Sequence, residues 1–584
     1  MLLTKLYELS QRKDIKAKLP IEGYDNVSVK WIVNIDLDGN LLGFDDLGDR
    51  HKRMLPNCKR SSGIKPKLLA DKCDYVFGYA EADTSKVAER HKQFKELVNK
   101  CAEYTQESSV FAVAKFLNNW LPERDNEKLI AKGIESAQTV TFWVNNYPND
   151  ETVIPTDITS VQSFWARSLT SEDDETTQQV IMTCLVTNQE RPVEERLPVV
   201  IKGIPNGQTS GTALVSANAL PFSSYGLKNS LTSPICREAG EGFAKALNYL
   251  LASDDSKFVL NNNVAFVFWT QNSTKVKSAV WKNDQPKKIR EILVGLISGD
   301  KRLARLKADR YYAVALSASG ARVVVRDWID IALDRAIQNL INWFDNQDLV
   351  DTWGEEDERR KYLSIYRLSK CLYRDAKKDD VARISTQLIH VAIQGGRLPT
   401  EILAQLVRRN RAERDVDRDR AALMKLVLTT QYPNQMTNMN SLNEDPQFTE
   451  PLDRAAYYCG RLLAQLEQIQ IQALGRDVNA TLIDRYYGAA SATPGKVLGK
   501  LVENSQPHLA RIRKDKRGVY EALQQQLEDI LSNISPEDGK FPTNLNTVQQ
   551  SIFALGYYHQ RAHNRKQAKD GAAARKQTAE VTAE

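Results

Sequence analysis

The spacing of apolar residues in this chain changes near Trp328, and that change constrains the fold more than any other feature. Before it, apolar residues alternate with mostly polar ones at 27–37, which predicts a strand with one buried face, and short strand-like runs follow at 264–269 and 322–328. After it, apolar residues recur every three to four positions, which is typical of amphipathic helices. We therefore expect an α+β multidomain protein, with a mixed α/β N-terminal region containing antiparallel sheet elements and an all-α C-terminal helical bundle.

The length and the helix signals suggest where the chain divides. A chain of 584 residues is too long for one core. The loop between Pro433 and Pro451 is the main predicted boundary, and beyond it Gly475 and Thr493 mark a helix stop and a helix start. The last residues are rich in Ala, Lys and Gln, with almost no apolar bulk. We predict an α/β region (1–330), a helical connecting region (331–433), a C-terminal helical bundle (434–565) and a disordered polar tail (566–584).

Cysteine usage and apolar run lengths limit the class of protein. The seven cysteines include no Cys-x-x-Cys pair, which argues against a disulfide framework and against a zinc module. The N-terminus is interrupted by charge too early for a signal peptide, and the longest apolar runs are far shorter than a membrane span. We therefore expect a cytoplasmic protein that does not interact with membranes.

The sequence lacks complete enzyme signatures. The segment from Gly203 to Thr209 resembles a nucleotide-binding loop but has no lysine to reach the phosphates. The acidic repeat at 415–419 lacks the glycine and the glutamate of a calcium loop, and the one-turn pair His559 and His563 has no accompanying ligand. We expect no catalytic residue, no metal and no cofactor. Two alternatives stay open, a nuclease with a site assembled from scattered acids and a structural helical adaptor.

A basic segment between positions 50 and 72 is the first candidate binding surface. It contains eight Lys or Arg residues and one acid, Asp71, and such clustering is typical of a surface that binds phosphates. Small hydroxyl residues and Gly63 would let backbone amides approach a phosphate closely. A solvated loop is the other interpretation. The candidate DNA-binding residues here are Lys59, Arg60, Ser61, Ser62, Lys65, Lys67 and Lys72.

A polar segment at 202–226 is the second candidate. Ten of its 25 residues are Gly, Ser or Thr, and amide side chains lie among them. Asn and Gln can read base edges, whereas Ser, Thr and backbone amides hold phosphates. A surface loop with several turns is the other interpretation. The candidates are Asn206, Gln208, Thr209, Ser210, Asn218, Ser223 and Tyr225.

A basic run at 511–517 in the predicted bundle is the third candidate. It offers five positive charges, which suits a single nucleic-acid strand, although a solvated helix end would look the same. The candidates are Arg511, Arg513, Lys514 and Lys516.

Several of these segments, in this order, resemble one family. They are Lys-Arg-Ser-Ser-Gly-Ile-Lys-Pro at 59–66, Gln-Thr-Ser-Gly at 208–211, Ser-Ser-Tyr-Gly at 223–226 and Asp-Arg-Tyr-Tyr-Gly at 484–488. Together they resemble the large subunit of the type I-C CRISPR surveillance complex (Cascade), from the first residues to about Arg565. The chain departs from the family at Lys67 and Lys72, where asparagines would be expected. That departure favours phosphate contact over base reading at these positions.

The resemblance implies a non-enzymatic subunit that recognises the short motif beside the protospacer in double-stranded DNA and helps to open the duplex. It implies as partners the target duplex and its displaced single strand, the guide RNA within the assembled complex, the backbone and guide-end-binding subunits, small subunits and a helicase–nuclease. It also implies that the C-terminal bundle is made separately as the small subunit, from an internal start at Met424, Met436 or Met439. We expect the bundle to fold alone.

Overall fold

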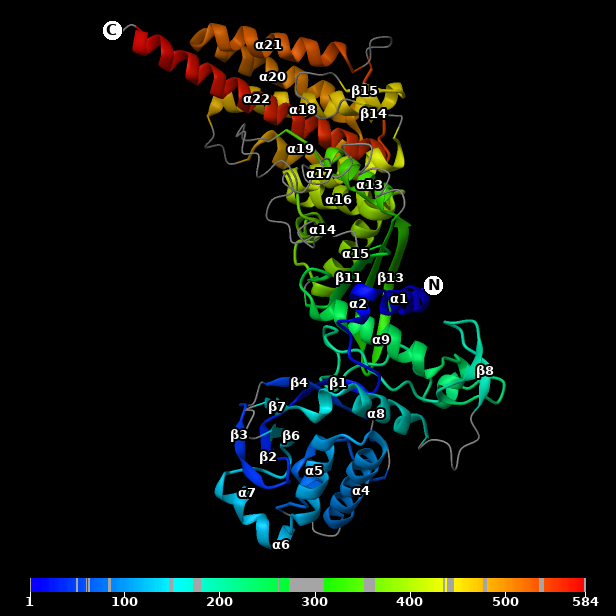
Figure 1. Cartoon of the computed structure of the whole chain (residues 1–584). Helices are drawn as coiled ribbons and strands as arrows, with labels where there is room; N and C mark the ends of the chain where they lie inside the picture. Colours follow the sequence, from blue (N-terminus) through cyan, green and yellow to red (C-terminus); the bar gives the residue numbers. More distant parts are fainter. Residues whose placement is uncertain are drawn as a thin grey trace. The chain divides into compact units, whose positions relative to one another are not determined.

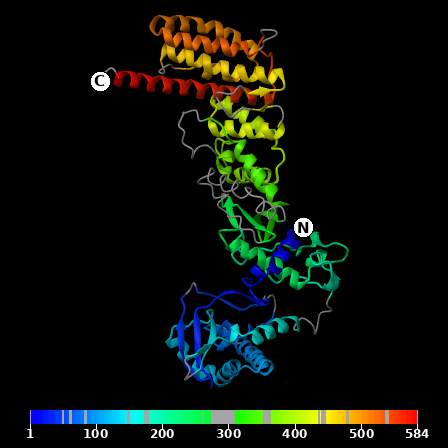
Figure 2. The ribbon, with the colours of Figure 1, turned by 45° about the horizontal axis from the view of Figure 1, so that its top comes forward.

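The computed structural model describes the chain in two compact units (Figures 1 and 2). The described residues are 2–48, 51–58, 60, 63–81, 86–146, 151–171, 180–260, 262–272, 309–350, 363–433, 436–437, 446–475, 480–534 and 540–581. The N-terminal unit comprises residues 1–202 and 209–249, and the C-terminal unit comprises residues 203–208 and 250–584. The chain passes between the units at 202/203, at 208/209 and within helix α9 (Arg237–Ala252).

A five-stranded mixed sheet forms the core of the N-terminal unit. Its order is β3-β2-β6-β5, with β7 paired to β6, and only β2 and β6 are parallel. Strands β2 and β3 form a hairpin joined by a turn at Gly39, as the strand pattern followed by Asp38-Gly39 predicts. The φ of Gly39 is +81°, and a Cβ there would lie 2.8 Å from the backbone nitrogen of Phe116, so both the turn and the close approach require glycine. The strands are β2 (Trp31–Asp36), β3 (Leu41–Asp46), β5 (Ala70–Lys72), β6 (Thr139–Asn146) and β7 (Glu151–Val153).

Helices and two short ladders complete the N-terminal unit. The helices are α1 (Leu2–Gln11), α2 (Lys13–Lys16), α3 (Cys73–Val76), α4 (Val87–Thr105), α5 (Ser108–Asn119), α6 (Pro122–Asp125), α7 (Glu127–Ala131) and α8 (Thr159–Ser171). The ladders pair β1 (Tyr24–Ser28) with β4 (Lys52–Pro56) and β8 (Ile181–Thr183) with β9 (Glu190–Pro192). The alternating residues Trp31, Val33 and Ile35 share a core with apolar residues of α4 and α5, which explains the strand periodicity of the sequence.

The C-terminal unit begins with a four-stranded antiparallel sheet and continues as helices. The sheet order is β10-β11-β12-β13, with β10 (Lys257–Leu260), β11 (Val264–Thr270), β12 (Arg310–Ser319) and β13 (Arg322–Ala332). The helices are α13 (Leu333–Asp345), α14 (Ile365–Lys370), α15 (Lys378–Gln394), α16 (Glu401–Glu413), α17 (Arg418–Gln431), α18 (Pro451–Leu474), α19 (Leu482–Ala492), α20 (Pro494–Asp515), α21 (Arg517–Ser532) and α22 (Thr547–Val581). The α+β multidomain class predicted from the sequence is thereby confirmed.

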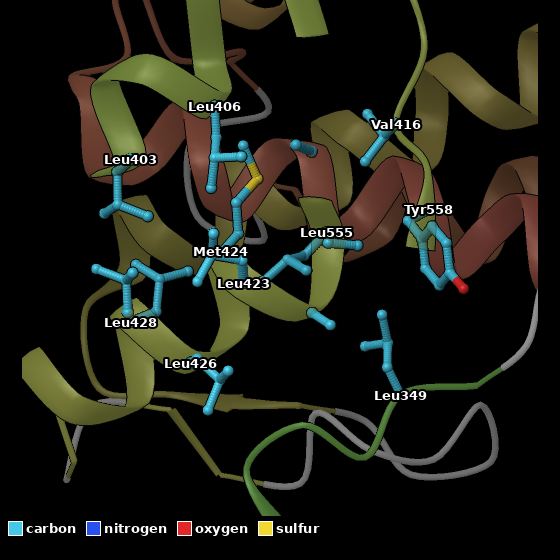
Figure 3. Close-up of a cluster of buried hydrophobic side chains, with 14 of the residues drawn as sticks. Leu349, Leu403, Leu406, Val416, Leu423, Met424, Leu426, Leu428, Leu555 and Tyr558 are labelled. Carbon is cyan, nitrogen blue, oxygen red and sulfur yellow. The ribbon is translucent and has the colours of Figure 1, made fainter. Parts of the chain in front are cut away.

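One hydrophobic core runs through the whole C-terminal unit, from Val264 in β11 to Tyr558 in α22. Figure 3 shows where it joins the bundle to the residues before it: Leu555 of α22 lies near Leu423 and Met424 of α17, and Tyr558 lies near Val416 and Leu349. Polar contacts follow the same path, since the Tyr558 hydroxyl donates to the Val350 carbonyl at 2.7 Å. The bundle therefore shares its core with residues before 434.

Two helices of the bundle approach each other at glycines. A Cβ on Gly460 of α18 would lie 1.9 Å from the carbonyl oxygen of Phe553, and a Cβ on Gly556 of α22 would lie 2.0 Å from that of Tyr457. Heavy atoms do not approach so closely, so only glycine permits this crossing of α18 and α22.

The structure differs from the sequence predictions at two places. The segment from Pro433 to Pro451 is not only a loop, because β14 (Met436–Thr437) pairs with β15 (Gln447–Phe448) within it. The predicted disordered tail is helical as far as Val581, because Ala, Lys, Arg and Gln are strong helix formers and extend a helix already fixed by packing. The two compact units divide near residue 250 and give no boundary at 330, 433 or 565. The predicted domain boundaries at these three positions therefore stay a proposal.

Candidate nucleic-acid interface

The basic segment of the N-terminal unit is organised around its one acid, Asp71. This residue is 2% exposed. It is ion-paired with the Arg60 guanidinium and accepts backbone hydrogen bonds from Lys67 and Lys72, each at 2.8 Å. Burial raises the pKa of Asp71, while Arg60 and the two backbone amides act in the opposite direction. Asp71 therefore holds the backbone at 67 and 72 and the side chain of Arg60 in place.

Arg60 makes two further contacts that hold the same loop. Its Nε donates to the Lys65 carbonyl at 2.7 Å, and its guanidinium lies 4.0 Å from the centroid of the Tyr75 ring. A guanidinium with an ion pair, a backbone acceptor and an aromatic face has most of its binding capacity used. The sequence predicts Arg60 as a DNA ligand from its charge, whereas its contacts in the structure are with the protein itself.

The lysines of this segment differ in exposure. Lys72 is exposed, whereas Lys65 and Lys67 are half-buried. Burial lowers the pKa of Lys67, and the Asp71 carboxylate opposes that shift. Lys59, Ser61 and Ser62 lie outside the described residues. Lys72 thus presents its ammonium group to solvent from backbone that Asp71 holds in place.

Asn206, in the C-terminal unit, has a structural role. Its φ is +59°, a conformation that Asn tolerates better than most residues. Its Nδ2 donates to the Asn262 carbonyl at 3.3 Å and to Asn263 Oδ1 at 3.2 Å. The neighbouring Gln208 is exposed. The amide of Asn206 is therefore bound to protein, whereas that of Gln208 faces solvent.

In the N-terminal unit, the polar segment ends in a tight turn. Tyr225 and Gly226 have φ of +51° and +73°, and the Leu227 amide donates to the Ser224 carbonyl at 2.8 Å. These features are those of a hairpin turn of the primed type. Tyr225 is 99% exposed at its tip. Thr209, Ser210, Asn218 and Ser223 are also exposed.

In the C-terminal unit, the predicted basic run lies at the junction of α20 and α21. Arg511, Arg513, Lys514 and Lys516 are all exposed, and the Arg513 guanidinium lies 5.7 Å from the centroid of the Tyr520 ring. Beside this junction, a cavity of about 700 Å³ lies between α18, α21 and α22. Its polar lining includes Gln468, Gln472, Lys516, Arg517, Asn564 and Gln567. Amides and cations in a concave surface suit a polar, anionic chain.

Comparison with known proteins gives a match over nearly the whole chain. Residues 3–564 match the family model described as CRISPR-associated protein (Cas_Csd1). The chain belongs to the Cas_Csd1 family. The match confirms the family predicted from the ordered motifs at 59–66, 208–211 and 223–226. A search of curated proteins gives no match.

The described part of this Cas_Csd1 protein adds two observations. It contains no helix that is both long and apolar enough to cross a membrane. Within the same residues, no three His, Cys, Asp or Glu side chains are gathered as metal ligands.

Sequence reasoning missed the roles of Asp71 and Tyr75 in forming the basic loop. The available signal was the presence of one acid among eight basic residues.

Proposed function

We propose that this Cas_Csd1 protein is the non-catalytic large subunit of a guide-RNA-directed antiviral complex of type I-C. It recognises the protospacer-adjacent motif in double-stranded DNA, assists duplex opening, stabilises the R-loop and presents the complex to the helicase–nuclease. The observation that carries this proposal is the basic loop, in which buried Asp71 and Arg60 hold the backbone that presents Lys72. In such a complex the guide RNA reads the long target sequence by base pairing, so the protein needs to recognise only a short motif and the shape of the DNA backbone. A few phosphate and base contacts are enough for that task.

The three candidate surfaces support different tasks in this proposal. Exposed Lys72 provides a phosphate contact, which fixes position without reading sequence. Gln208 and Asn218 are the proposed readers of base edges, and exposed Ser and Thr residues nearby in the sequence add phosphate contacts. The junction of α20 and α21 is the proposed site for the displaced strand, because its exposed cations adjoin a polar cavity.

The assembled complex supplies the remaining partners in the proposal. The guide RNA is bound through the backbone and guide-end-binding subunits, and small subunits lie along the displaced strand. Residues 434–565 are proposed to be made also as a separate small subunit. Changing Met424, Met436 and Met439 together to Leu should abolish a small helical product that co-purifies with the complex. Persistence of that product in the triple variant would contradict an internal start at these residues.

The test of motif recognition uses the purified complex and duplexes with correct or altered flanking motifs. Lys72→Ala should lower the slope of log binding constant against log salt by about 0.9 for every duplex, because one phosphate contact is lost. Gln208→Ala and Asn218→Ala should instead reduce discrimination between motifs, with each good base contact worth about 1–3 kcal/mol. Lys132→Ala is the matched control, since Lys132 is exposed in the same unit but lies far along the sequence from the loop. An unchanged salt slope for Lys72→Ala would show that the basic loop does not contact the DNA.

The two alternatives predict different outcomes in simple assays. A nuclease with scattered acids would cleave a labelled duplex when the isolated protein is given magnesium. A structural adaptor would show no salt-sensitive binding to DNA. We expect salt-sensitive binding without cleavage.

A further inference from the structure

Two charged segments without a task in the proposed function meet in the C-terminal unit. One is the charge-dense segment 408–420, and the other is 484–488 in α19. Helices α16 and α19 are in contact (Figure 1). The Nε of Arg411 lies 3.8 Å from the position of a Cβ on Gly488, so the guanidinium passes beside the bare backbone of α19. The fold thus joins residues that are more than 70 positions apart in the sequence.

The acids of the first segment are bound by other arginines. Arg420, only 2% exposed, is ion-paired with Glu413 at 2.9 Å and with Asp417 at 2.8 Å. Asp415 pairs with Arg561 of α22 at 2.7 Å. Asp419 pairs with Arg367 at 2.7 Å. Every acid between 413 and 419 is therefore already occupied.

Four arginines of the two segments are left exposed. They are Arg408, Arg411, Arg414 and Arg485, and among the described residues none of them makes an ion pair within 4 Å. Arg408 and Arg411 are one turn apart on α16, and exposed side chains at that spacing lie on one face. Asp484, the acid of α19, accepts hydrogen bonds from Thr481 on one carboxylate oxygen, at 2.9 and 3.0 Å. These bonds and the charge of Arg414 lower the pKa of Asp484, so it stays ionised. It therefore offsets one of the four positive charges and leaves the others in place.

Arg414 occupies a backbone conformation that normally favours glycine. It is the C-cap of α16, with φ of +57°, and its amide donates to the Asn410 carbonyl at 2.7 Å. A side chain at such a position costs stability that glycine would not. In α19, Tyr486 follows Arg485 in the sequence and is 37% exposed. An accessible aromatic ring therefore adjoins one of the exposed guanidinium groups along the chain.

We propose that Arg408, Arg411, Arg414, Arg485 and Tyr486, here named the α16–α19 patch, bind a nucleic-acid strand in addition to the three surfaces above. The guanidinium groups contact phosphates, for which their planar donors are well suited, and Tyr486 stacks on a base. The exposed ring favours a strand with accessible bases over an acidic protein. The proposal rests on the proposed function only in that the protein acts on nucleic acid.

The test measures binding of the full-length protein to a labelled single-stranded DNA and to a single-stranded RNA of equal length. The variant Arg408→Gln/Arg411→Gln/Arg485→Gln should lower the salt slope by about 0.7 for each lost contact, or about 2 in total. The strand with the larger loss identifies the ligand as DNA or RNA. The matched control is Arg335→Gln/Arg383→Gln/Arg397→Gln, which removes the same charge from exposed arginines elsewhere in the unit.

Single variants at two positions separate binding from folding. Arg414→Gly should raise the thermal midpoint, because the strained conformation is relieved, and yet weaken strand binding. Tyr486→Ala should weaken binding about 5- to 150-fold, whereas Tyr486→Phe keeps the ring and should retain it. Ultraviolet crosslinking of a strand that carries 4-thiouridine or 5-bromodeoxyuridine should attach to Tyr486.

Three results would overturn the proposal. The first is a salt slope that the patch variant leaves unchanged, and the second is an equal loss in the control variant, which would reflect net charge alone. The third is a patch variant that binds both strands normally but loses an acidic protein partner. Motif discrimination on duplexes is measured in the same preparations, and it should stay intact in the patch variants. Failure of the patch and failure of motif recognition are therefore distinguishable.

Discussion

Replacing Arg60 with Ala distinguishes a residue that builds the basic loop from one that binds DNA. The change leaves the Asp71 carboxylate, 2% exposed, without its ion-pair partner. It also removes the hydrogen bond to the Lys65 carbonyl and the contact with the Tyr75 ring. Breaking a buried ion pair by deleting one partner costs about 3–5 kcal/mol. Because the Arg60 side chain is itself 24% exposed, we expect the lower end of this range, about 3 kcal/mol.

The assay is a thermodynamic cycle in chemical denaturation, with Arg60→Ala, Asp71→Asn and the double variant. The double variant should cost less than the sum of the single ones, because it contains no unpaired buried charge. Arg60→Lys should be intermediate, since lysine keeps the charge but loses the planar donors that reach Lys65 and stack on Tyr75. Lys72→Ala is the control, and its free energy of unfolding should stay within about 0.5 kcal/mol of the unmodified protein.

The reasoning is refuted by one combination of results. If Arg60→Ala leaves the free energy of unfolding unchanged and lowers the salt slope of DNA binding as Lys72→Ala does, then Arg60 is a phosphate ligand and does not organise the loop.

Three further predictions concern the C-terminal unit. Gly460→Ala and Gly556→Ala should each destabilise the protein by about 1–3 kcal/mol in denaturation, because the new methyl group forces α18 and α22 apart, whereas Gly571→Ala, with open space around it, should stabilise it; the same sign for all three would contradict the close crossing. Burial, together with Arg461 and Lys425, lowers the pKa of His559 in the folded chain to about 3, whereas the ordinary pKa of histidine is 6.5. Between these two values His559 is protonated in the unfolded chain but not in the folded one. Stability should therefore fall by about 1.4 kcal/mol per pH unit as pH drops from 6.5 towards 3, and His559→Gln should remove that part of the slope, which denaturation at several pH values would show. A fragment of residues 363–581 should melt cooperatively and at a higher temperature than a fragment of residues 436–565, because only the longer one retains α16 and α17, which pack against α22; equal midpoints in calorimetry would contradict the shared core.

The elements of the fold were largely predictable from local patterns. Alternation at 31–35 and the turn at Gly39 predict the β2–β3 hairpin, and Pro451 with Gly475 predicts the bounds of α18. Such signals lie within a few residues of each other. The helical tail was missed because composition rich in Ala, Lys and Gln is typical both of disorder and of a helix continued from packed residues.

The candidate site was predicted as a set of segments but not as a set of roles. Charge counting located 50–72, but it treated Arg60 and Lys72 as equivalent, because the burial of Asp71 is set by contacts across the fold. Likewise, the pairing of Asp415 with Arg561 spans 146 positions, so the sequence could not show which arginines of 408–420 stay exposed. Burial and long-range pairing decide which charges are available, and neither has a local signal.

The core shared by α16, α17 and α22 has a consequence for protein synthesis. A product started at Met436 would lack both α16 and α17, and it would leave Leu555 and Tyr558 uncovered. Such a product would be prone to self-association and to proteolysis unless another chain covered that face. Its abundance in a cell would then depend on the supply of that covering chain rather than on its own rate of translation, so the stoichiometry of an assembly could be set by degradation of the excess.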